Sequence, residues 1–488
     1  MNKQAIIFTM LAQVTLGLVA QPPRSYKRGV SENNFTRAEE INSLARGVTW
    51  FYNWGNLPNS PIAGVVGPGT DMEYVPMIWS ANFDEARLRA YLTEHPGVKY
   101  LLGYNEPNFR AQANMTPDSA AALWPIVEKI AEDFNLKLVA PALNYSGEAL
   151  SDGKVYQPNE WMDAFLAAYP EAHFDYLALH CYMNSNVGQI NYVENFAKRY
   201  GKQVWLTEFC SWEGNVDSLS QQAAMALKIQ DLELSPYVYR YAWFKAKGTN
   251  SVPYYRLLIT PNVITHQPPI GTLSGAGQIY TYMSAFDTTY YWRATDVIPA
   301  KDYVYSSAIT IGLNTDTESD VKLQLNSFDV YSFTDYLIDV PTTGKYSMLL
   351  RNTNYKFLYA PQINVIVDDV VVAQSNLPTT ANGDSDIDSK WKTHTIQNIQ
   401  LTAGKHRLRL RSNRSTTCKL GWFQFVLQTI PGDVNGDGSV DGNDLNDLIN
   451  VVLGKTSADT FDGRANVDGQ GDIDGNDLNM LINILLGK

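Results

Sequence analysis

The stretch Val98–Asn108, VKYLLGYNEPN, is an apolar run that stops abruptly at an Asn-Glu-Pro triplet. Its residues Val98 and 100–102 are typical of a strand buried on both faces, as in parallel sheets. Pro107 disfavours the helical region for the residue before it, so we expect the strand to end with Glu106 at its C-terminal tip. A carboxylate in that place predicts a (β/α)8 TIM barrel, whose active sites lie at the C-terminal ends of the strands.

A second segment, Gln203–Phe209 (QVWLTEF), repeats this design with Glu208 at its tip. Because the C-terminal ends of barrel strands meet on one face, the two glutamates should lie close together. Such a pair indicates glycoside hydrolysis. In that chemistry one acid protonates the departing oxygen, and in a retaining enzyme a second carboxylate about 5 Å away attacks the anomeric carbon.

The chain around these segments alternates strand-like and helix-like runs over residues 26–287, as a parallel α/β barrel requires. The predicted strands are eight, at 27–30, 48–54, 74–79, 100–105, 137–140, 174–180, 204–208 and 237–243. Helical spacing of apolar residues marks 37–44, 84–94, 119–134, 160–169, 218–234 and a last helix from about 274 to 286. The Gly- and Pro-rich stretch 56–72 is predicted to be a loop in place of a helix.

Length and composition set limits on the whole chain. Its 488 residues provide material for about three domains. Residues 1–20 predict a cleaved secretory signal, and hence a secreted or cell-surface protein without a membrane span. The three cysteines are too few for a disulfide framework, and we expect Cys181 and Cys210 to be buried free thiols. A net charge of −12 argues against nucleic acid as a partner.

Several motifs resemble those of glycoside hydrolase family 128, a clan A family of β-1,3-glucanases. They are GYNEPN (103–108), LTEF (206–209), EYVPMIW (73–79) and HCY (180–182). The resemblance implies that Glu106 is the acid/base and Glu208 the nucleophile of a retaining endo-β-1,3-glucanase. Such an enzyme hydrolyses a laminarin- or curdlan-like glucan by double displacement, without a cofactor for catalysis.

Two alternatives to this function stay open. One is a different clan A β-glycanase, for instance one that cuts mixed-linkage glucan. The other is a noncatalytic polysaccharide-binding protein attached to a scaffold, against which the presence of both strand-tip glutamates argues.

Polar and aromatic residues at the same strand ends are candidate substrate contacts. Asn105 is placed to hydrogen-bond a sugar hydroxyl, with a strand-end turn cap as the alternative. His180 and Tyr182 are expected to hold Glu208 ionised or to contact substrate, with a packed core role as the alternative for His180. Aromatic rings cover the flat CH faces of sugars, and core packing is the alternative for most of them. The remaining candidates are Tyr104, Trp54, Trp79, Trp212 and Trp243, of which Trp243 is expected to form the floor under the reacting sugar.

Residues 290–428 have a different pattern. Short alternating runs at 322–325, 345–351, 363–372, 394–399, 405–411 and 422–427 predict an all-β jelly-roll sandwich. The segments GKYSMLLR (344–351), VIVDDVVV (365–372), WKTHTIQNIQLTAGKHRLRL (391–410) and LGWFQF (420–425) resemble a family 6 carbohydrate-binding module. Trp391 is expected to be a sugar platform there, although Lys419 occupies the position of that family's ligand-binding Asn.

Residues 430–488 contain an internal repeat, because DGNDLNDLINVVLGK (441–455) returns as DGNDLNMLINILLGK (474–488) 33 residues later. Each copy follows a loop with oxygen side chains at alternate positions, as in the first half of an EF-hand calcium loop. The duplicated unit resembles a type I dockerin, a small α-helical calcium-binding domain, which implies Ca²⁺ and a cohesin-like scaffold partner. The candidate ligands are Asp433, Asn435, Asp437, the Ser439 carbonyl, Asp441 and Asp444 in the first loop, and Asn466, Asp468, Gln470, Asp472, Asp474 and Asp477 in the second. The second loop should bind calcium more weakly, since Asn466 and Gln470 replace acids.

Overall fold

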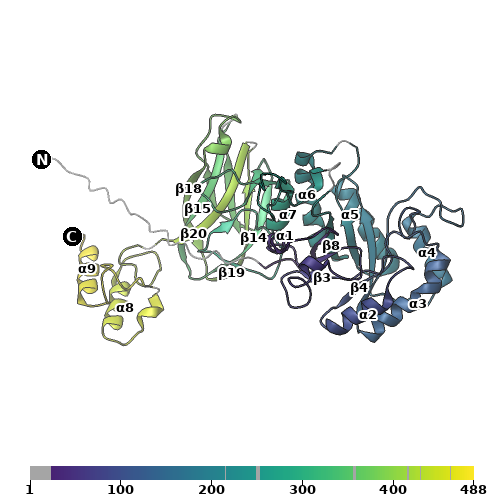
Figure 1. Ribbon diagram of the computed structural model, residues 1–488. Coiled ribbons are helices and arrows are strands. Elements are labelled where there is room, and N and C mark those ends of the chain that lie inside the picture. The colour runs from purple at the N-terminus through teal and green to yellow at the C-terminus, as the bar shows by residue number, and fades with distance from the viewer. Residues whose placement is uncertain are drawn as a thin grey trace.

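The structure is a computed structural model that describes residues 23–214, 216–248, 253–355, 359–414, 417–428, 430–461 and 463–488. The predicted secretory signal, residues 1–20, lies outside these residues. Three parts follow one another: parallel strands ringed by helices, a sandwich of antiparallel strands, and a small helical part (Figure 1). The predicted architecture is confirmed in outline.

The first part is a closed parallel barrel with the strand order β3-β2-β1-β8-β7-β6-β5-β4. Its two end strands meet through a parallel bridge between Met77 and Leu102, and the Ile78 N–H donates to the Leu102 carbonyl over 2.9 Å. The strands are β1 (Arg28–Ser31), β2 (Trp50–Tyr52), β3 (Glu73–Tyr74), β4 (Tyr100–Leu102), β5 (Lys137–Leu143), β6 (Tyr176–Cys181), β7 (Val204–Phe209) and β8 (Val238–Phe244).

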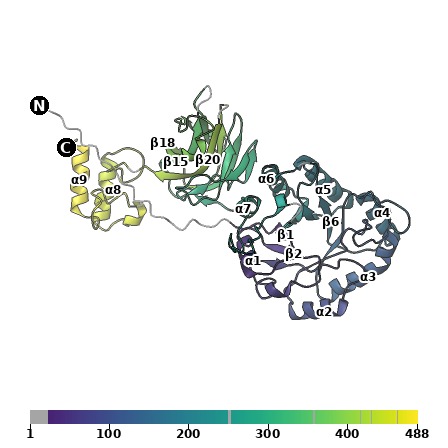
Figure 2. The ribbon, with the colours of Figure 1, turned by 45° about the horizontal axis from the view of Figure 1, so that its top comes forward.

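Helices surround these strands (Figure 2). They are α1 (Ala38–Leu44), α2 (Glu85–Glu94), α3 (Pro117–Asp133), α4 (Pro158–Ala168), α5 (Asn186–Tyr200), α6 (Ser218–Leu234) and α7 (Gly275–Tyr282). The loop predicted between β2 and β3 contains one short 3-10 turn, η1 (Ser60–Ile62), and α5 was not among the predicted helices. A second 3-10 turn, η2 (Pro253–Tyr255), follows β8.

Side chains along each strand alternate between the barrel interior and the helices, as a period of two requires. In β2, Trp50 and Tyr52 belong to the interior cluster, whereas Phe51 packs with the helices. In β8, Ala242 faces inward and Trp243 outward. This alternation decides which side chain at each strand end points into a site on the barrel axis.

The second part is a sandwich of two antiparallel sheets. One has the order β12-β13-β20-β15-β18 with β10 beside β20, and the other β11-β14-β19-β16-β17 with β9 beside β14. The strands are β9 (Trp292–Arg293), β10 (Ile298–Pro299), β11 (Tyr305–Ser307), β12 (Thr310–Leu313), β13 (Leu323–Ser327), β14 (Phe333–Val340), β15 (Gly344–Tyr355), β16 (Gln362–Val367), β17 (Val370–Asn376), β18 (Lys392–Leu401), β19 (Gly404–Ser412) and β20 (Thr417–Leu427), with η3 (Ile387–Ser389) before β18.

One predicted strand of the sandwich is in fact a hairpin. The run 363–372 turns at Asp368 and Asp369, whose φ angles of 48° and 68° reverse the chain between β16 and β17. Two consecutive left-handed residues form the tight turn whose twist suits a hairpin, and Asp tolerates this conformation. The apolar residues on both sides of Asp368 and Asp369 therefore belong to two strands and not to one.

The sandwich packs directly on the barrel. A single hydrophobic core contains residues of both parts, and β12 lies beside α6 and α7. The Ser306 hydroxyl donates to Oε1 of Gln230 over 2.6 Å, and the Ser284 hydroxyl donates to the Tyr303 carbonyl over 2.8 Å. Barrel and sandwich therefore share one apolar interior.

The third part consists of α8 (Gly442–Val452) and α9 (Gly475–Leu485), with η4 (Ala458–Phe461) between them. Asp441 and Asp474 cap the two helices in the same way, as the sequence repeat implies. Its small core consists of Val434, Leu448, Phe461, Ala465 and Leu481. Across the described residues no helix has the length and apolar character needed to cross a membrane, and all three cysteines are buried free thiols.

Candidate active site

A cleft of about 580 Å³ opens at the C-terminal ends of the barrel strands. Both strand-tip glutamates reach it, together with a mixture of aromatic and amide side chains. Its lining residues are Asn33, Trp54, Trp79, Asn105, Glu106, Phe109, Gln112, Asn144, Tyr182, Glu208, Trp212, Phe244 and Lys245.

A β-bulge turns Glu208 into this cleft. Along β7, Trp205 faces the interior and Leu206 faces the helices. Strict alternation would then point Glu208 outward. The register with β6 and β8 shifts after Leu206, however, so that Thr207 is an extra residue and Glu208 pairs with His180. Bulges of this kind re-aim side chains beside active sites.

Three neutral donors hold the Glu208 carboxylate. The Trp54 indole N–H donates to Oε1 over 2.7 Å, and the Tyr52 hydroxyl donates to the same atom over 3.2 Å. The Tyr182 hydroxyl donates to Oε2. Hydrogen bonds from several donors favour the ionised form of a carboxylate.

Glu106 follows the end of β4, and its φ of 43° places it in the left-handed region. Asn144 Nδ2 donates to its Oε1 over 3.0 Å, and His180 Nδ1 lies 2.8 Å from the same atom. Its other oxygen, Oε2, accepts no hydrogen bond from any residue that the structure describes. One oxygen is thus anchored to the protein while the other is left for a ligand.

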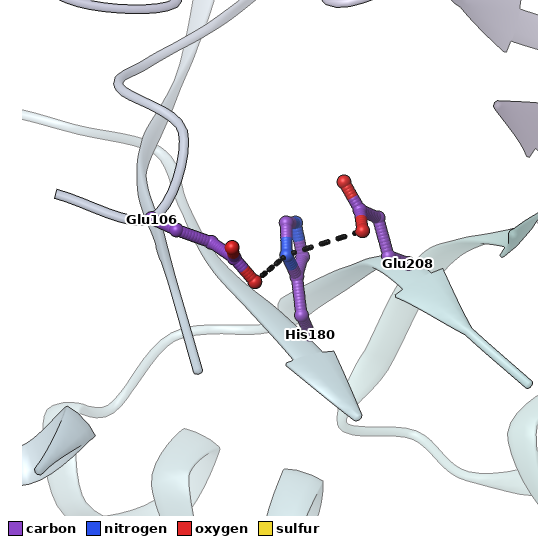
Figure 3. A group of neighbouring side chains, drawn as sticks. All are labelled: Glu106, His180 and Glu208. Carbon is purple, nitrogen blue, oxygen red and sulfur yellow. Dashed lines mark hydrogen bonds and ion pairs between the residues drawn. The ribbon is translucent and has the colours of Figure 1, made fainter. Parts of the chain in front are cut away.

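His180 lies between the two glutamates (Figure 3). Its Nδ1 is 2.8 Å from Glu106 Oε1 and 3.5 Å from Glu208 Oε2, and its side chain is 0% exposed. One oxygen of each carboxylate and a ring nitrogen of His180 all lie within 4.8 Å of one another. The three groups must therefore titrate as a coupled unit.

The environment shifts the pKa values of all three groups. Burial acts to lower the pKa of His180, but the carboxylates of Glu208 and Glu106 outweigh it and raise that pKa. Burial acts to raise the pKa of Glu106, and the charge and hydrogen bond of His180, with the Asn144 amide, lower it overall. Burial and the Glu106 charge raise the pKa of Glu208, against His180, Tyr182 and Trp54.

Aromatic rings form the wall around Glu208. Phe244 lies with its ring centre 5.9 Å from that of Trp54, 5.5 Å from that of Tyr182 and 5.9 Å from that of Trp212. Trp79 lines the cleft on the side of Asn105, where the Trp79 carbonyl accepts the Asn105 N–H over 2.9 Å. Such a wall suits the CH faces of a sugar ring.

Asn105 offers a polar contact in the same cleft. Its Nδ2 donates weakly to Gln112 Oε1 over 3.4 Å, and its buried Oδ1 has no hydrogen-bond partner among the described residues. Buried polar atoms are normally hydrogen-bonded. The unpaired oxygen therefore fits a hydroxyl group of a bound ligand.

A comparison with known protein families identifies the family to which the residues of this site belong. A family model described as the glycosyl hydrolase catalytic core matches residues 29–280, just over half of the chain. The chain belongs to this family. It is therefore a glycoside hydrolase, and the cleft with its glutamate pair lies within the matched residues.

Solved structures similar to this hydrolase include glycoside hydrolase family 128 enzymes. A subgroup II endo-β-1,3-glucanase from Pseudomonas viridiflava is 36% identical, over 53% of this chain and 98% of its own, with a TM-score of 0.45. A second from Sorangium cellulosum is 31% identical, over 52% and 97%, with a TM-score of 0.45. A subgroup III curdlan-specific exo-β-1,3-glucanase from Blastomyces gilchristii is 26% identical, over 53% and 98%, with a TM-score of 0.41.

The C-terminal part of the hydrolase matches a second family model. Residues 431–486 match the dockerin type I domain, as the repeat predicts. The likeness of the sandwich to a family 6 carbohydrate-binding module stays a prediction. No curated protein matches the chain.

Three predicted contacts of the hydrolase are wrong. Trp243 faces the helices because it alternates with Ala242, and its indole N–H donates to the Tyr255 carbonyl over 2.7 Å. Tyr104 is buried against Trp124 among the residues that pack with the helices, although Leu102 two residues earlier faces the interior, so the alternation breaks at this strand end. Neither side chain lines the cleft.

The third wrong prediction is Trp391. This residue is 8% exposed, and its indole N–H donates to the Thr315 hydroxyl over 3.0 Å. Asp388, three residues earlier, accepts a hydrogen bond from the same Thr315 hydroxyl over 3.1 Å and lies 2.5 Å from Lys419 Nζ. The ring is therefore a packing residue and not an open platform.

The structure also adds residues that sequence reasoning missed. Tyr52 and Asn144 donate to the two glutamates, and Phe244 takes the place in the wall expected for Trp243. His180 does not line the cleft and contacts the glutamates instead. The only sequence signal for Phe244 was its position one residue beyond Trp243, on the opposite face of β8.

The two C-terminal loops form matching acidic pockets. Asp444 and Asp477 are fully buried, and each accepts backbone N–H groups of its own loop. The buried Oδ1 of Asn466 has no partner among the described residues. The two buried carboxylates, together with the orphaned oxygen of Asn466, suit the all-oxygen ligand set of Ca²⁺.

Proposed function

We propose that the protein is a secreted, retaining endo-β-1,3-glucanase. The observation that carries this proposal is the spacing of the glutamates, whose nearest carboxylate oxygens lie within 4.8 Å of one another. Retaining enzymes hold their carboxyl groups about 5–5.5 Å apart, whereas inverting enzymes leave about 6.5–9.5 Å for a water molecule.

The surroundings of the glutamates support distinct roles. Glu208, held by three donors, is the nucleophile, because an oriented and ionised carboxylate can attack the anomeric carbon. Glu106 is the acid/base, because its Oε2 is free of protein donors and can carry a proton toward the cleft. These roles agree with those that the motif resemblance implies.

The proton then follows a simple course. As Glu208 bonds to the anomeric carbon, Glu106 gives its proton to the departing glycosidic oxygen. Bond formation removes the negative charge of Glu208, and the ionised Glu106 left behind is stabilised by His180 and Asn144, so that it can act as a base. Glu106 next accepts a proton from water, which displaces Glu208 and releases a product with the original anomeric configuration.

The linkage and the mode of action rest on the motifs 103–108 and 206–209, which resemble those of β-1,3-glucanases. The similar solved structures are described as β-1,3-glucanases, of endo and exo type. The long wall from Trp79 to Trp212 suits a chain bound across the cleft. The Asn105 amide would bond the 2-hydroxyl, where contacts strengthen in the transition state.

The C-terminal domain supports attachment to a scaffold. We assign one Ca²⁺ to each loop, held by the side chains predicted from the repeat, and a cohesin-like protein as the partner of the dockerin type I domain. Such attachment, together with the predicted secretory signal, supports an extracellular or cell-surface location.

Product analysis tests the proposed function. The protein would be incubated with laminarin, curdlan, mixed-linkage glucan and a β-1,4-glucan, with Glu208→Gln as the inactive control. We expect a spread of β-1,3-linked oligosaccharides, and proton NMR should show the β-anomer appearing first. Products from the β-1,4-glucan alone, or an α-anomer as the first product, would contradict the proposal.

A further inference from the structure

Two adjacent loops contribute Tyr182 and Trp212 to the lining of the cleft. Tyr182 lies just beyond β6, and Trp212 just beyond β7. The Trp212 N–H donates to the Tyr182 carbonyl over 3.0 Å. Asn184 and Glu213 form three further hydrogen bonds, of 2.6 Å, 3.1 Å and 3.4 Å. The loops are thus joined into one unit, so a shift of either would move the Tyr182 hydroxyl.

Helix α6 holds this unit from behind through Lys228. Its Nζ donates to the Met183 carbonyl over 2.6 Å and to the Ser211 hydroxyl over 2.9 Å, so that it bonds one group in each loop. Gln221 of the same helix bonds both the N–H and the carbonyl of Ser211 over 3.0 Å. Lys228 is fully buried.

This ammonium group is costly to bury. No carboxylate of a described residue forms an ion pair with Lys228, whose titratable neighbours are Cys181, Cys210 and Glu213. A buried charge without a counter-ion destabilises the folded state, because the protein interior solvates it poorly. Methionine would fill a similar volume without that cost. What lysine adds is a charged donor to two loops, and such bonds are about twice as strong as neutral ones.

We propose that Lys228 is a positioning residue for hydrolysis. Its ammonium group fixes the two loops and thereby sets the Tyr182 hydroxyl against the Glu208 carboxylate. This inference rests on the proposed function, because it gives Lys228 a role in preparing Glu208 for attack.

The inference has a pH signature. Burial lowers the pKa of Lys228 to about 8, against the opposing influence of Cys181, Cys210 and Glu213. Deprotonation at mildly alkaline pH removes the charge and weakens both bonds to the loops. The rate at which Glu208 attacks the anomeric carbon should therefore fall above this pH, even for a substrate whose leaving group needs no acid catalysis.

Lys228→Met tests the inference with the full chain and the 2,4-dinitrophenyl β-glycoside of laminaribiose, whose leaving group needs no proton. We expect kcat to fall about 10- to 100-fold, since a misplacement near 1 Å costs that much, while KM changes less than about threefold. The kcat/KM of the wild type should decline above pH 8, and the variant should lack this decline. Ile229→Ala, a buried change on the same helix, should lower Tm with kcat unchanged.

A variant with wild-type kcat and the wild-type alkaline decline would overturn the inference, as would an equal loss of kcat in Ile229→Ala. If the wild type does not turn over this substrate, the proposed function fails instead. In that case the emission of Trp212 tests the role of Lys228. This emission is the difference in fluorescence between the wild type and Trp212→Phe. The emission of Trp212 should change near pH 8. If the same change persists when both proteins also carry Lys228→Met, the positioning role of Lys228 is wrong.

Discussion

The indole N–H of Trp54 donates to Oε1 of Glu208 over 2.7 Å, from a backbone whose φ is 60°. A non-glycine residue in the left-handed region costs of the order of about 1–3 kcal/mol and persists only where its surroundings hold it. Here the same ring also forms part of the cleft wall against Phe244. One strained residue thus both shapes the cleft and orients a carboxylate.

Trp54→Phe should lower kcat more than it raises KM. The phenyl ring keeps an apolar wall but removes the donor to Glu208, and a hydrogen bond to a charged group contributes about 1.5–3 kcal/mol, or roughly 10- to 100-fold in rate. Steady-state kinetics on laminarin would measure it. Trp79→Phe is the matched control, because Trp79 lines the cleft without bonding either glutamate, and its main effect should be on KM. Equal effects of the two variants on kcat would refute the orienting role.

Glu106→Gln and Glu208→Gln should each nearly abolish hydrolysis, with a loss of at least about 10²–10⁴-fold for the acid/base. Azide should restore turnover of an activated glycoside with inverted products only in a small-residue variant such as Glu208→Ala, since azide then attacks from the face that Glu208 vacates. Chromatography and NMR of the glycosyl azides would identify the products. Near wild-type turnover by either Gln variant would dismiss the assignment.

His180→Asn should move both limbs of the kcat/KM profile to higher pH. His180 lowers the pKa of Glu106 and opposes the raised pKa of Glu208, so its removal lets both values rise. Turnover needs Glu106 protonated and Glu208 ionised, and because the two carboxyl groups titrate as a coupled unit, each limb belongs to the pair and not to one residue. Asn144→Ala is the control and should shift the profile less than His180→Asn, because Asn144 bonds only Glu106 whereas His180 contacts both carboxylates. An acidic shift of either limb in His180→Asn would show that the histidine acts differently.

Calcium should drive folding of residues 430–488 without affecting hydrolysis. Asp444 and Asp477 are fully buried carboxylates, whose repulsion and desolvation a divalent cation would relieve. Calorimetry of the full chain should show two calcium ions bound, the first loop more tightly. Asp444→Asn should remove the tighter event and Asp477→Asn the weaker one. The part should lose helicity in chelator while activity on laminarin persists, and a loss of activity in chelator would contradict this separation.

The strand-tip glutamates were predictable because each follows an apolar run, and such runs are typical of strands buried on both faces. The β-bulge at Thr207 was not predictable, since nothing in LTEF marks an extra residue, and without it Glu208 would point at the helices. The choice between Trp243 and Phe244 failed for the same reason. Which face a strand-end residue occupies depends on pairing with neighbours, and both residues are aromatic.

Two partners of the glutamates, Tyr52 and Asn144, were beyond sequence reasoning for another reason. Asn144 reaches Glu106 from a loop 38 residues later, and Tyr52 reaches Glu208 from 156 residues earlier. Only barrel closure brings these side chains together. The C-terminal repeat, in contrast, was read from local spacing alone, because each loop supplies its own ligands.

The apolar interior shared by barrel and sandwich has a practical consequence for anyone who trims this enzyme. A chain cut after residue 287 would leave the faces of α6 and α7 that meet β12 bare in water. Exposed apolar surface of that kind promotes aggregation. A chain that ends at residue 287 should therefore be insoluble when expressed. A chain that ends at residue 428 keeps the sandwich over these faces and should remain in solution. The sandwich keeps these faces of α6 and α7 covered, whether or not it binds a sugar.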